Sequence, residues 1–133
     1  MDDWRTETAA DLEYARGKLR KTLDEISGEP TADQVHSIWT AYIRLEKSVV
    51  FVKLELELEN PGVFVNPKPY KVPDERQAIS FALRSLDGGI AKFSSGDLAG
   101  SLPELRDARN YIRVLLRDLR RRRLKRARSA RVA

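Results

Sequence analysis

The chain has 133 residues, of which 41% are hydrophobic and 34% are charged, and it contains no cysteine. This length fits one domain with a single hydrophobic core, and the lack of cysteine excludes disulfides and thiolate metal sites. No apolar run reaches the roughly 18 residues that span a bilayer, and the N-terminus lacks the basic start and apolar segment of a secretory signal. We therefore expect an intracellular, cytoplasmic protein with no membrane partner.

The net charge of +5 is unevenly distributed along the chain. Residues 120–133 contain eight of the 25 basic residues and none of the 20 acidic ones, so the remainder holds 17 bases against 20 acids, a net charge of −3. Positive charge gathered in one segment is typical of proteins that bind polyanions. The sequence thus predicts a helical bundle domain at 1–119 and a basic C-terminal tail at 120–133.

The first predicted helix runs from about Thr6 to Ile26, because apolar residues recur at steps of three and four. Its apolar face consists of Leu12, Ala15, Leu19, Leu23 and Ile26. The Ser-Gly-Glu-Pro sequence at 27–30 ends this helix, since Gly tolerates the left-handed C-terminal conformation and Pro cannot continue the hydrogen bonds. Thr31 and Gln34 then have the spacing of a capping box that opens a second helix.

The second predicted helix has an apolar register that begins at Val35 and uses either Ile38 or Trp39. Residues 50–58 also alternate as a strand would, but helix is favoured because the three-four spacing is unbroken and Leu, Glu and Lys are good helix formers. As a helix, this stretch is apolar around more than half of its circumference, which implies a partner. The residues predicted to form that interface are Val50, Phe51, Leu54 and Leu58.

Residues 60–73 contain four prolines and predict an extended connection that packs Val63, Phe64 and Val65 along the bundle. A third helix follows from Asp74 to about Phe93, and its Gly88-Gly89 pair marks either a close approach of another backbone or a break. A fourth helix starts at 101–104 and carries an apolar stripe. That stripe consists of Leu105, Ala108, Ile112, Leu115 and Leu119.

These elements predict an all-α fold, a four-helix bundle made of two antiparallel helical hairpins joined by a proline-rich crossover. A basic C-terminal helical extension follows the fourth helix. The two halves share a pattern of apolar and aromatic residues at an offset of 67 to 69 residues, as in Tyr14 and Phe81, which leaves an internal duplication open.

No arrangement of residues predicts catalysis. The one histidine, His36, has no nearby Ser, Cys or Asp that would form a triad, and a single His does not make a zinc site. Glu55, Glu57 and Glu59 alternate, which is not the spacing of a carboxylate-bridged di-iron bundle. We therefore predict a protein that is not an enzyme and needs no cofactor or metal.

A basic track is predicted along the fourth helix and the tail. Its first four members, which lie beside the apolar stripe, are Arg106, Arg109, Arg113 and Arg117. The tail adds Arg120, Arg121, Arg122, Arg123, Lys125, Arg126, Arg128 and Arg131. An alternative for the first four is that they pair with acids on neighbouring helices. The tail itself is expected to be disordered until phosphates relieve its like-charge repulsion.

The sequence therefore predicts a non-enzymatic nucleic-acid-binding or ribonucleoprotein accessory protein that uses its basic tail. The tail has no aromatic residue to stack on bases and no Asn or Gln to read base edges, so binding to RNA or DNA should be largely independent of sequence. The alternative is an assembly subunit, a homodimer or part of a larger complex, whose main interface is the apolar second half of helix two.

Overall fold

The computed structural model describes residues 3–59 and 74–132, and within these ranges it contains four α-helices and no strand. The helices are α1 (Asp3–Glu25), α2 (Ala32–Glu59), α3 (Glu75–Ser94) and α4 (Leu98–Val132). The prediction of an all-α protein with four principal helices is confirmed, and 50–58 is helix rather than strand. The predicted packing of Val63, Phe64 and Val65 concerns residues outside the described ranges.

Local side-chain contacts explain where α2 and α3 begin. The backbone amide of Gln34 donates to Thr31 Oγ1 at 3.2 Å, and the Thr31 amide donates to Gln34 Oε1 at 2.9 Å. This reciprocal pair confirms the predicted capping box. At the start of α3, the Gln77 amide donates to Asp74 Oδ1 at 2.8 Å. Before α2, Gly28 has a φ of 72°, which is a left-handed conformation that glycine adopts without strain.

The predicted start of the fourth helix at Ser101 is wrong, because α4 begins one turn earlier at Leu98. Asp97 caps this earlier turn: its Oδ1 accepts from the Gly100 amide at 2.9 Å, and its carbonyl accepts from the Ser101 amide at 3.0 Å. Pro103 consequently lies inside the helix rather than in its first turn. The early start places Leu98 in the first turn of α4, where it is buried.

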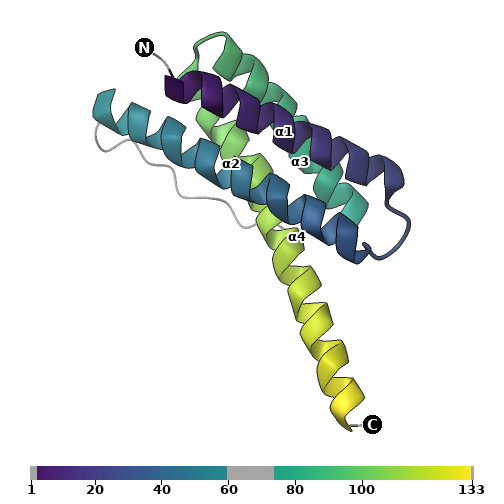
Figure 1. Cartoon of the computed structure of the whole chain (residues 1–133). Helices are drawn as coiled ribbons and strands as arrows, with labels where there is room; N and C mark the ends of the chain where they lie inside the picture. Colours follow the sequence, from purple (N-terminus) through teal and green to yellow (C-terminus); the bar gives the residue numbers. More distant parts are fainter. Residues whose placement is uncertain (1–2, 60–73, 133) are drawn as a thin grey trace.

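Each helix packs against two others within the described residues. The contacting pairs are α1 with α2, α3 with α4, α2 with α4, and α1 with α3, so the diagonal pairs are α1/α4 and α2/α3. Figure 1 shows α1 and α2 running in opposite directions on one side, with α3 behind α1. It also shows the C-terminal part of α4 projecting beyond the other three helices.

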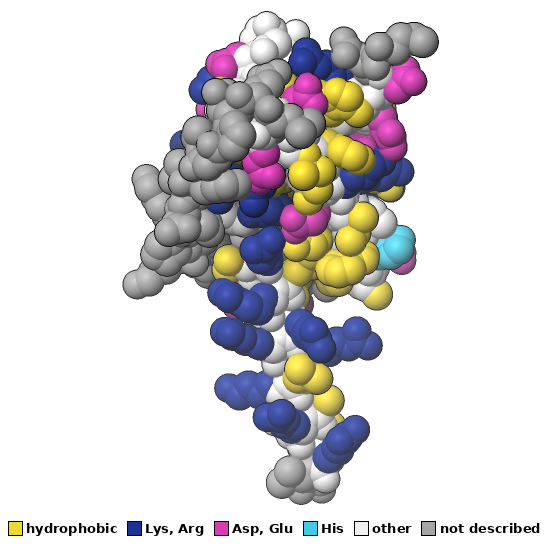
Figure 2. All heavy atoms as spheres, turned by 90° about the vertical axis from the view of Figure 1, so that its left-hand side faces the viewer, with side chains coloured by type: hydrophobic (Ala, Val, Ile, Leu, Met, Phe, Trp, Pro, Cys, Tyr) yellow, Lys and Arg dark blue, Asp and Glu magenta, His cyan; other side chains and the backbone are white. Residues whose placement is uncertain are grey.

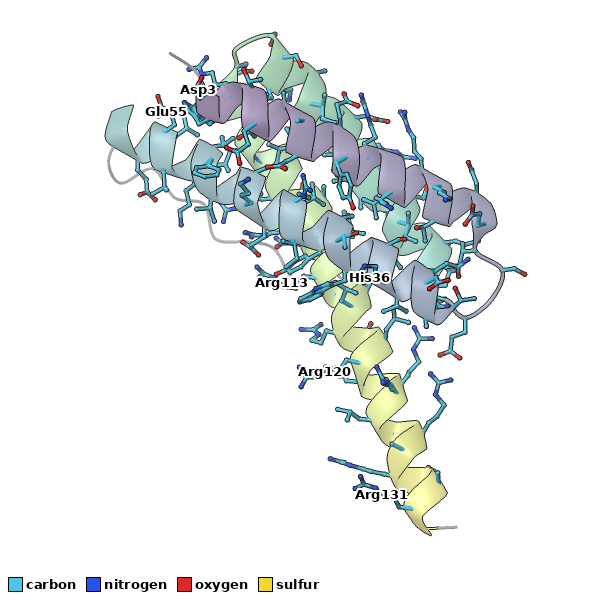
Figure 3. The ribbon with its side chains drawn as sticks, viewed as in Figure 1. Asp3, His36, Glu55, Arg113, Arg120 and Arg131 are labelled. Carbon is cyan, nitrogen blue, oxygen red and sulfur yellow. The ribbon has the colours of Figure 1, made fainter. Side chains whose placement is uncertain are left out.

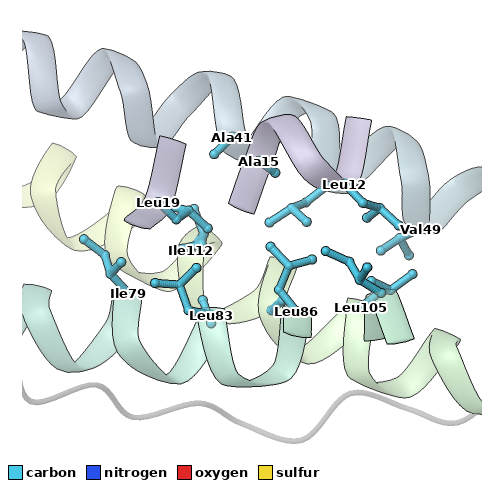
Figure 4. Close-up of a cluster of buried hydrophobic side chains, with 14 of the residues drawn as sticks. Leu12, Ala15, Leu19, Ala41, Val49, Ile79, Leu83, Leu86, Leu105 and Ile112 are labelled. Atoms are coloured by element: carbon cyan, nitrogen blue, oxygen red, sulfur yellow. The ribbon is translucent and has the colours of Figure 1, made fainter. Parts of the chain in front are cut away.

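The core lies where the apolar faces of the four helices meet (Figure 4). Its largest fully buried side chains include Leu12 and Leu19 of α1, Leu45 of α2, and Leu86 of α3. Leu105 and Ile112 of α4 belong to the same set, at 0% exposure. Because these are the residues of the predicted three-four stripes, the hydrophobic periodicity of the sequence located the core correctly.

The Gly88-Gly89 pair lies within a continuous α3 and allows α4 to approach closely. A Cβ on Gly89 would lie 2.6 Å from Leu105 Cδ2 and 3.3 Å from the Leu105 backbone nitrogen. A Cβ on Gly88 would lie 2.7 Å from a carboxylate oxygen of Glu104. Of the two predicted roles for these glycines, the structure shows close packing and not a break in the helix.

Substituting the two glycines separately tests this packing. Gly89→Ala should lower the free energy of unfolding by about 1–2 kcal/mol, because the fully buried Leu105 has no space to move into. Gly88→Ala should be neutral or stabilising by up to about 1 kcal/mol, because the Glu104 side chain is partly exposed and can turn away while the helix gains propensity. Urea unfolding monitored by circular dichroism measures both. Equal effects at the two positions would contradict this account.

Candidate nucleic-acid interface

The end of α4 continues as a helix where the bundle no longer covers it. Leu119 is 8% exposed and is the last buried residue in the described part of the chain, whereas every side chain from Arg120 to Arg131 is exposed. We call residues 120–131 the basic segment. Figure 2 shows its Lys and Arg side chains on both sides of a helix that projects from the body.

The expectation that these residues are disordered without a ligand is wrong in this structure, since α4 is helical to Val132. The physical reason is that the basic segment continues an existing helix and needs no new nucleation step. Arg, Lys, Ala and Leu all have high helix propensity. Cations are also favoured near a helix C-terminus, where the backbone carbonyls carry partial negative charge.

Two cations of the basic segment pair with acids at the nearby end of the bundle. Arg126 forms a bidentate salt bridge with Glu29. Its two terminal nitrogens lie 2.7 and 2.6 Å from the two carboxylate oxygens. Arg122 Nη2 lies 2.5 Å from Glu75 Oε1. The Arg126–Glu29 pair is exposed, and such pairs contribute only about 0–1 kcal/mol. They nevertheless show which side of the segment faces the bundle.

The other six cations of the basic segment form no ion pair with any residue in the described part of the chain. These are Arg120, Arg121, Arg123, Lys125, Arg128 and Arg131. Their positive charge is therefore not neutralised by an ion pair with any described residue and is available to a polyanion. This separation of paired and unpaired cations could not be read from the run of arginines in the sequence.

Arg109, a member of the predicted basic track, is in the interior. It is 9% exposed, its Nη1 lies 3.0 Å from Glu46 Oε1, and it also donates two hydrogen bonds of 3.1 Å to Asn110 Oδ1. The acid that it contacts belongs to α2, the neighbouring helix. The structure therefore agrees with the alternative prediction for Arg109, namely that it pairs with an acid on a neighbouring helix.

Arg113 belongs to the same cluster but lies nearer the surface. Its Nη2 is 3.1 Å from Glu46 Oε2, and its Nε is 3.4 Å from the hydroxyl of Tyr42. That hydroxyl donates to Glu46 Oε2 at 2.8 Å. Burial, the largest effect, favours the neutral form of Glu46, but the Tyr42 hydrogen bond and the two arginines together outweigh it and lower the pKa of Glu46.

The remaining members of the track, Arg106 and Arg117, differ in exposure. Arg106 is half-buried and already interacts within the protein. Arg117 is exposed and forms no ion pair with a described residue. Of the four arginines beside the apolar stripe, only Arg117 therefore resembles the six unpaired cations of the basic segment.

The predicted apolar interface on α2 is partly exposed. Val50 and Leu54 are 44% and 49% exposed, whereas Phe51 is half-buried and lies beneath Lys47, whose Nζ is 5.9 Å from the ring centre. The side chain of Leu58 is outside the described part of the structure. Sequence reasoning missed two further members of this face.

The residues missed on α2 are Trp39 and Ile43, which are 49% and 46% exposed. They continue the face of Val50 and Leu54, because residues four and seven positions apart lie on one side of a helix. The sequence left the choice between Ile38 and Trp39 open, and the structure buries Ile38 completely. One signal in the sequence could have made this choice. Ile38 lies seven residues before Leu45 and eleven before Val49, so it shares their side of the helix.

A groove of about 470 Å³ lies between the first turns of α2 and the end of the buried part of α4. Its apolar lining includes Val35 and Trp39 of α2 with Leu116 and Leu119 of α4. Arginines of the basic segment stand at the same groove, namely Arg120, Arg123 and Arg126. In Figure 2, apolar side chains of the body gather directly above the cationic side chains of the projecting helix.

Other kinds of site are not found in the described part of the chain. No group of three or more His, Asp or Glu side chains there is placed to hold a metal ion. His36 is exposed on α2, near its first turn. None of the described helices combines the length and apolar character that crossing a membrane requires. No protein family, curated protein or solved structure matches this chain at a significant level.

The cluster around Glu46 generates a prediction about stability and pH. A carboxyl group with a lowered pKa in the folded state stabilises the protein above its unfolded pKa, and this stabilisation is lost as pH falls through the folded value. Glu46→Gln should therefore cost about 1–2 kcal/mol at neutral pH, because Arg109 remains buried without its anionic partner. The variant should also lose less stability than the wild type between pH 6 and pH 3, a window of about one and a half units either side of an ordinary carboxyl pKa.

The matched control is Glu57→Gln, which removes one carboxylate from the same helix. Glu57 pairs with Lys53 at 3.9 Å on the surface, and such pairs contribute little. Chemical unfolding across the pH range gives the stability of both variants. Identical pH profiles for wild type and Glu46→Gln would contradict the role assigned to this cluster.

Proposed function

We propose that this protein binds nucleic acid without catalysing a reaction, either alone or as an accessory protein of a ribonucleoprotein. In this proposal two helical hairpins, α1/α2 and α3/α4, joined through the proline-rich residues 60–73, form the body. The basic segment is a helical extension that binds phosphates. The observation that carries the proposal is that six cations on this exposed helix have no acidic partner among the described residues.

The chemistry of the basic segment suits phosphates better than an acidic protein. Five of the six unpaired cations are arginines, whose planar forks match the oxygens of a phosphate. Residues 120–131 extend about 17 Å along the helix axis, and their side chains radiate around it. A continuous polyanion can contact several of these side chains at once. The segment has no Asn, Gln or aromatic residue, so its contacts should not depend on sequence.

The salt dependence of binding tests this proposal. If all six unpaired cations contact phosphates of a DNA duplex, the logarithm of the affinity should fall with the logarithm of salt concentration with a slope of about −5. Deleting 120–133 should remove most of the binding and leave the bundle folded, because burial ends at Leu119. Fluorescence anisotropy with a labelled duplex measures the slope. Unchanged affinity after the deletion would refute the proposal.

Two double variants with the same loss of charge sharpen the test. Arg121→Gln/Arg128→Gln removes two unpaired cations and should reduce the magnitude of the slope by about 2. Arg122→Gln/Arg126→Gln removes the two cations that already face Glu75 and Glu29, so it should weaken binding through the overall field while leaving the slope nearly unchanged. Equal changes in slope would show that pairing inside the protein does not determine which cations bind.

A second candidate function is assembly through α2, and the observation that favours it is the exposed apolar face formed by Trp39, Ile43, Val50 and Leu54. Monomeric proteins rarely expose large contiguous apolar patches. If this face joins two copies, Val50→Glu/Leu54→Glu should convert a dimer into a monomer in sedimentation velocity. A wild-type protein that is monomeric at high concentration would exclude this interface between copies.

A further inference from the structure

We infer that the groove between α2 and α4 receives an unpaired base of a single-stranded nucleic acid, with Trp39 as the stacking surface and Arg120 and Arg123 as the phosphate ligands. This inference rests on the proposed function and narrows its ligand from nucleic acid in general to single strands. The basic segment alone has no aromatic residue, so the stacking surface has to come from another part of the chain.

Trp39 has the exposure and the support that a stacking surface needs. Its side chain is 49% exposed and lines the groove. It packs on Tyr42 with ring centres 5.7 Å apart and ring planes inclined by 33°. The Tyr42 hydroxyl is itself held by its hydrogen bonds with Glu46 and Arg113, at 2.8 and 3.4 Å. This chain of contacts restrains the tryptophan before any ligand arrives, which lowers the entropic cost of binding.

The charges at the groove are complementary to phosphate. Three arginines of the basic segment and one acid, Glu29, line it. Both carboxylate oxygens of Glu29 are occupied by Arg126, which leaves Arg120 and Arg123 without a partner in the described residues. Figure 3 shows Arg120 on α4 just beyond the point where this helix leaves the other three. An apolar floor bordered by free arginines fits a flat, weakly polar ring joined to phosphates.

An unpaired base fits this arrangement and a base pair within a duplex does not. In a duplex, both faces of every base are covered by its neighbours, so no face is free to lie on a tryptophan. In a single strand, stacking on an aromatic side chain adds affinity and tolerates any base. The groove volume of about 470 Å³ is also within the range of pockets that hold small planar ligands.

The experiment compares three polyanions: an oligothymidylate of about 20 nucleotides, a DNA duplex of the same length, and inorganic polyphosphate. Trp4→Phe leaves Trp39 as the only tryptophan, so its fluorescence reports on the groove. We expect oligothymidylate to quench this fluorescence and polyphosphate to leave it unchanged. In the wild-type background, Trp39→Ala should weaken oligothymidylate binding about ten-fold and change duplex and polyphosphate binding by less than about two-fold.

Two further variants serve as controls. Leu54→Ala removes an apolar side chain of the same helix with the same 49% exposure, but away from the groove, and should leave oligothymidylate binding unchanged. Trp39→Phe retains an aromatic ring and should restore most of the affinity that Trp39→Ala loses. Because Trp39 is half exposed, circular dichroism and the thermal midpoint should show that each variant is folded.

The outcomes separate this inference from the proposed function. If Trp39→Ala binds oligothymidylate as the wild type does while deletion of 120–133 abolishes binding, the stacking site is refuted and the basic segment remains the binding element. If neither change affects binding, both proposals fail. Equal quenching by polyphosphate and oligothymidylate, or tighter binding to the duplex than to the single strand, would also overturn the assignment of the groove to an unpaired base.

Discussion

The arrangement of this protein depends on the point at which the apolar stripe of α4 ends. Up to Leu119, the helix buries one face against α2 and α3, and this burial supplies the main stabilisation of the fold. Beyond Leu119 the same helix continues with no apolar face to bury. With 35 residues, α4 is about 52 Å long, compared with about 30 Å for the 20 residues of α3. This excess length leaves six of the eight cations of the basic segment without an acidic partner among the described residues.

The acids of the body are largely engaged inside the protein, which explains why the basic segment stays cationic. Glu46 is held by Arg109 and Arg113, and the buried Asp11 pairs with Arg44 at 2.6 Å and with Lys47 at 3.2 Å. Among the acids of the described residues, only Glu29 and Glu75 reach the basic segment, and each binds one arginine. A rigid helix cannot fold back to collect more acids, so the local charge remains strongly positive even though the body is net negative.

The candidate interface combines two kinds of contact that come from distant parts of the chain. Electrostatic attraction by the basic segment acts at long range and weakens with salt. The groove can contribute only short-range packing contacts with a ligand. These would come from the tryptophan of α2 and the apolar residues of α4. The tilted contact of Trp39 with Tyr42 connects the groove to the buried cluster around Glu46. The position of the aromatic ring therefore depends on the same polar network that joins α2 to α4.

The sequence by itself determined the number of described helices, the core stripes and the segregation of charge, because these follow from patterns within a few residues. The capping contacts of Thr31 and Asp74 are local for the same reason. The sequence misplaced the start of α4 by one turn. It also could not show that Arg109 is paired inside the protein and that Arg117 is exposed, since both lie beside the apolar stripe. That difference depends on Glu46, which belongs to another helix and contacts Arg109. Tertiary packing also placed Trp39 beside Arg120, residues far apart in the chain, because α2 and α4 meet where burial ends.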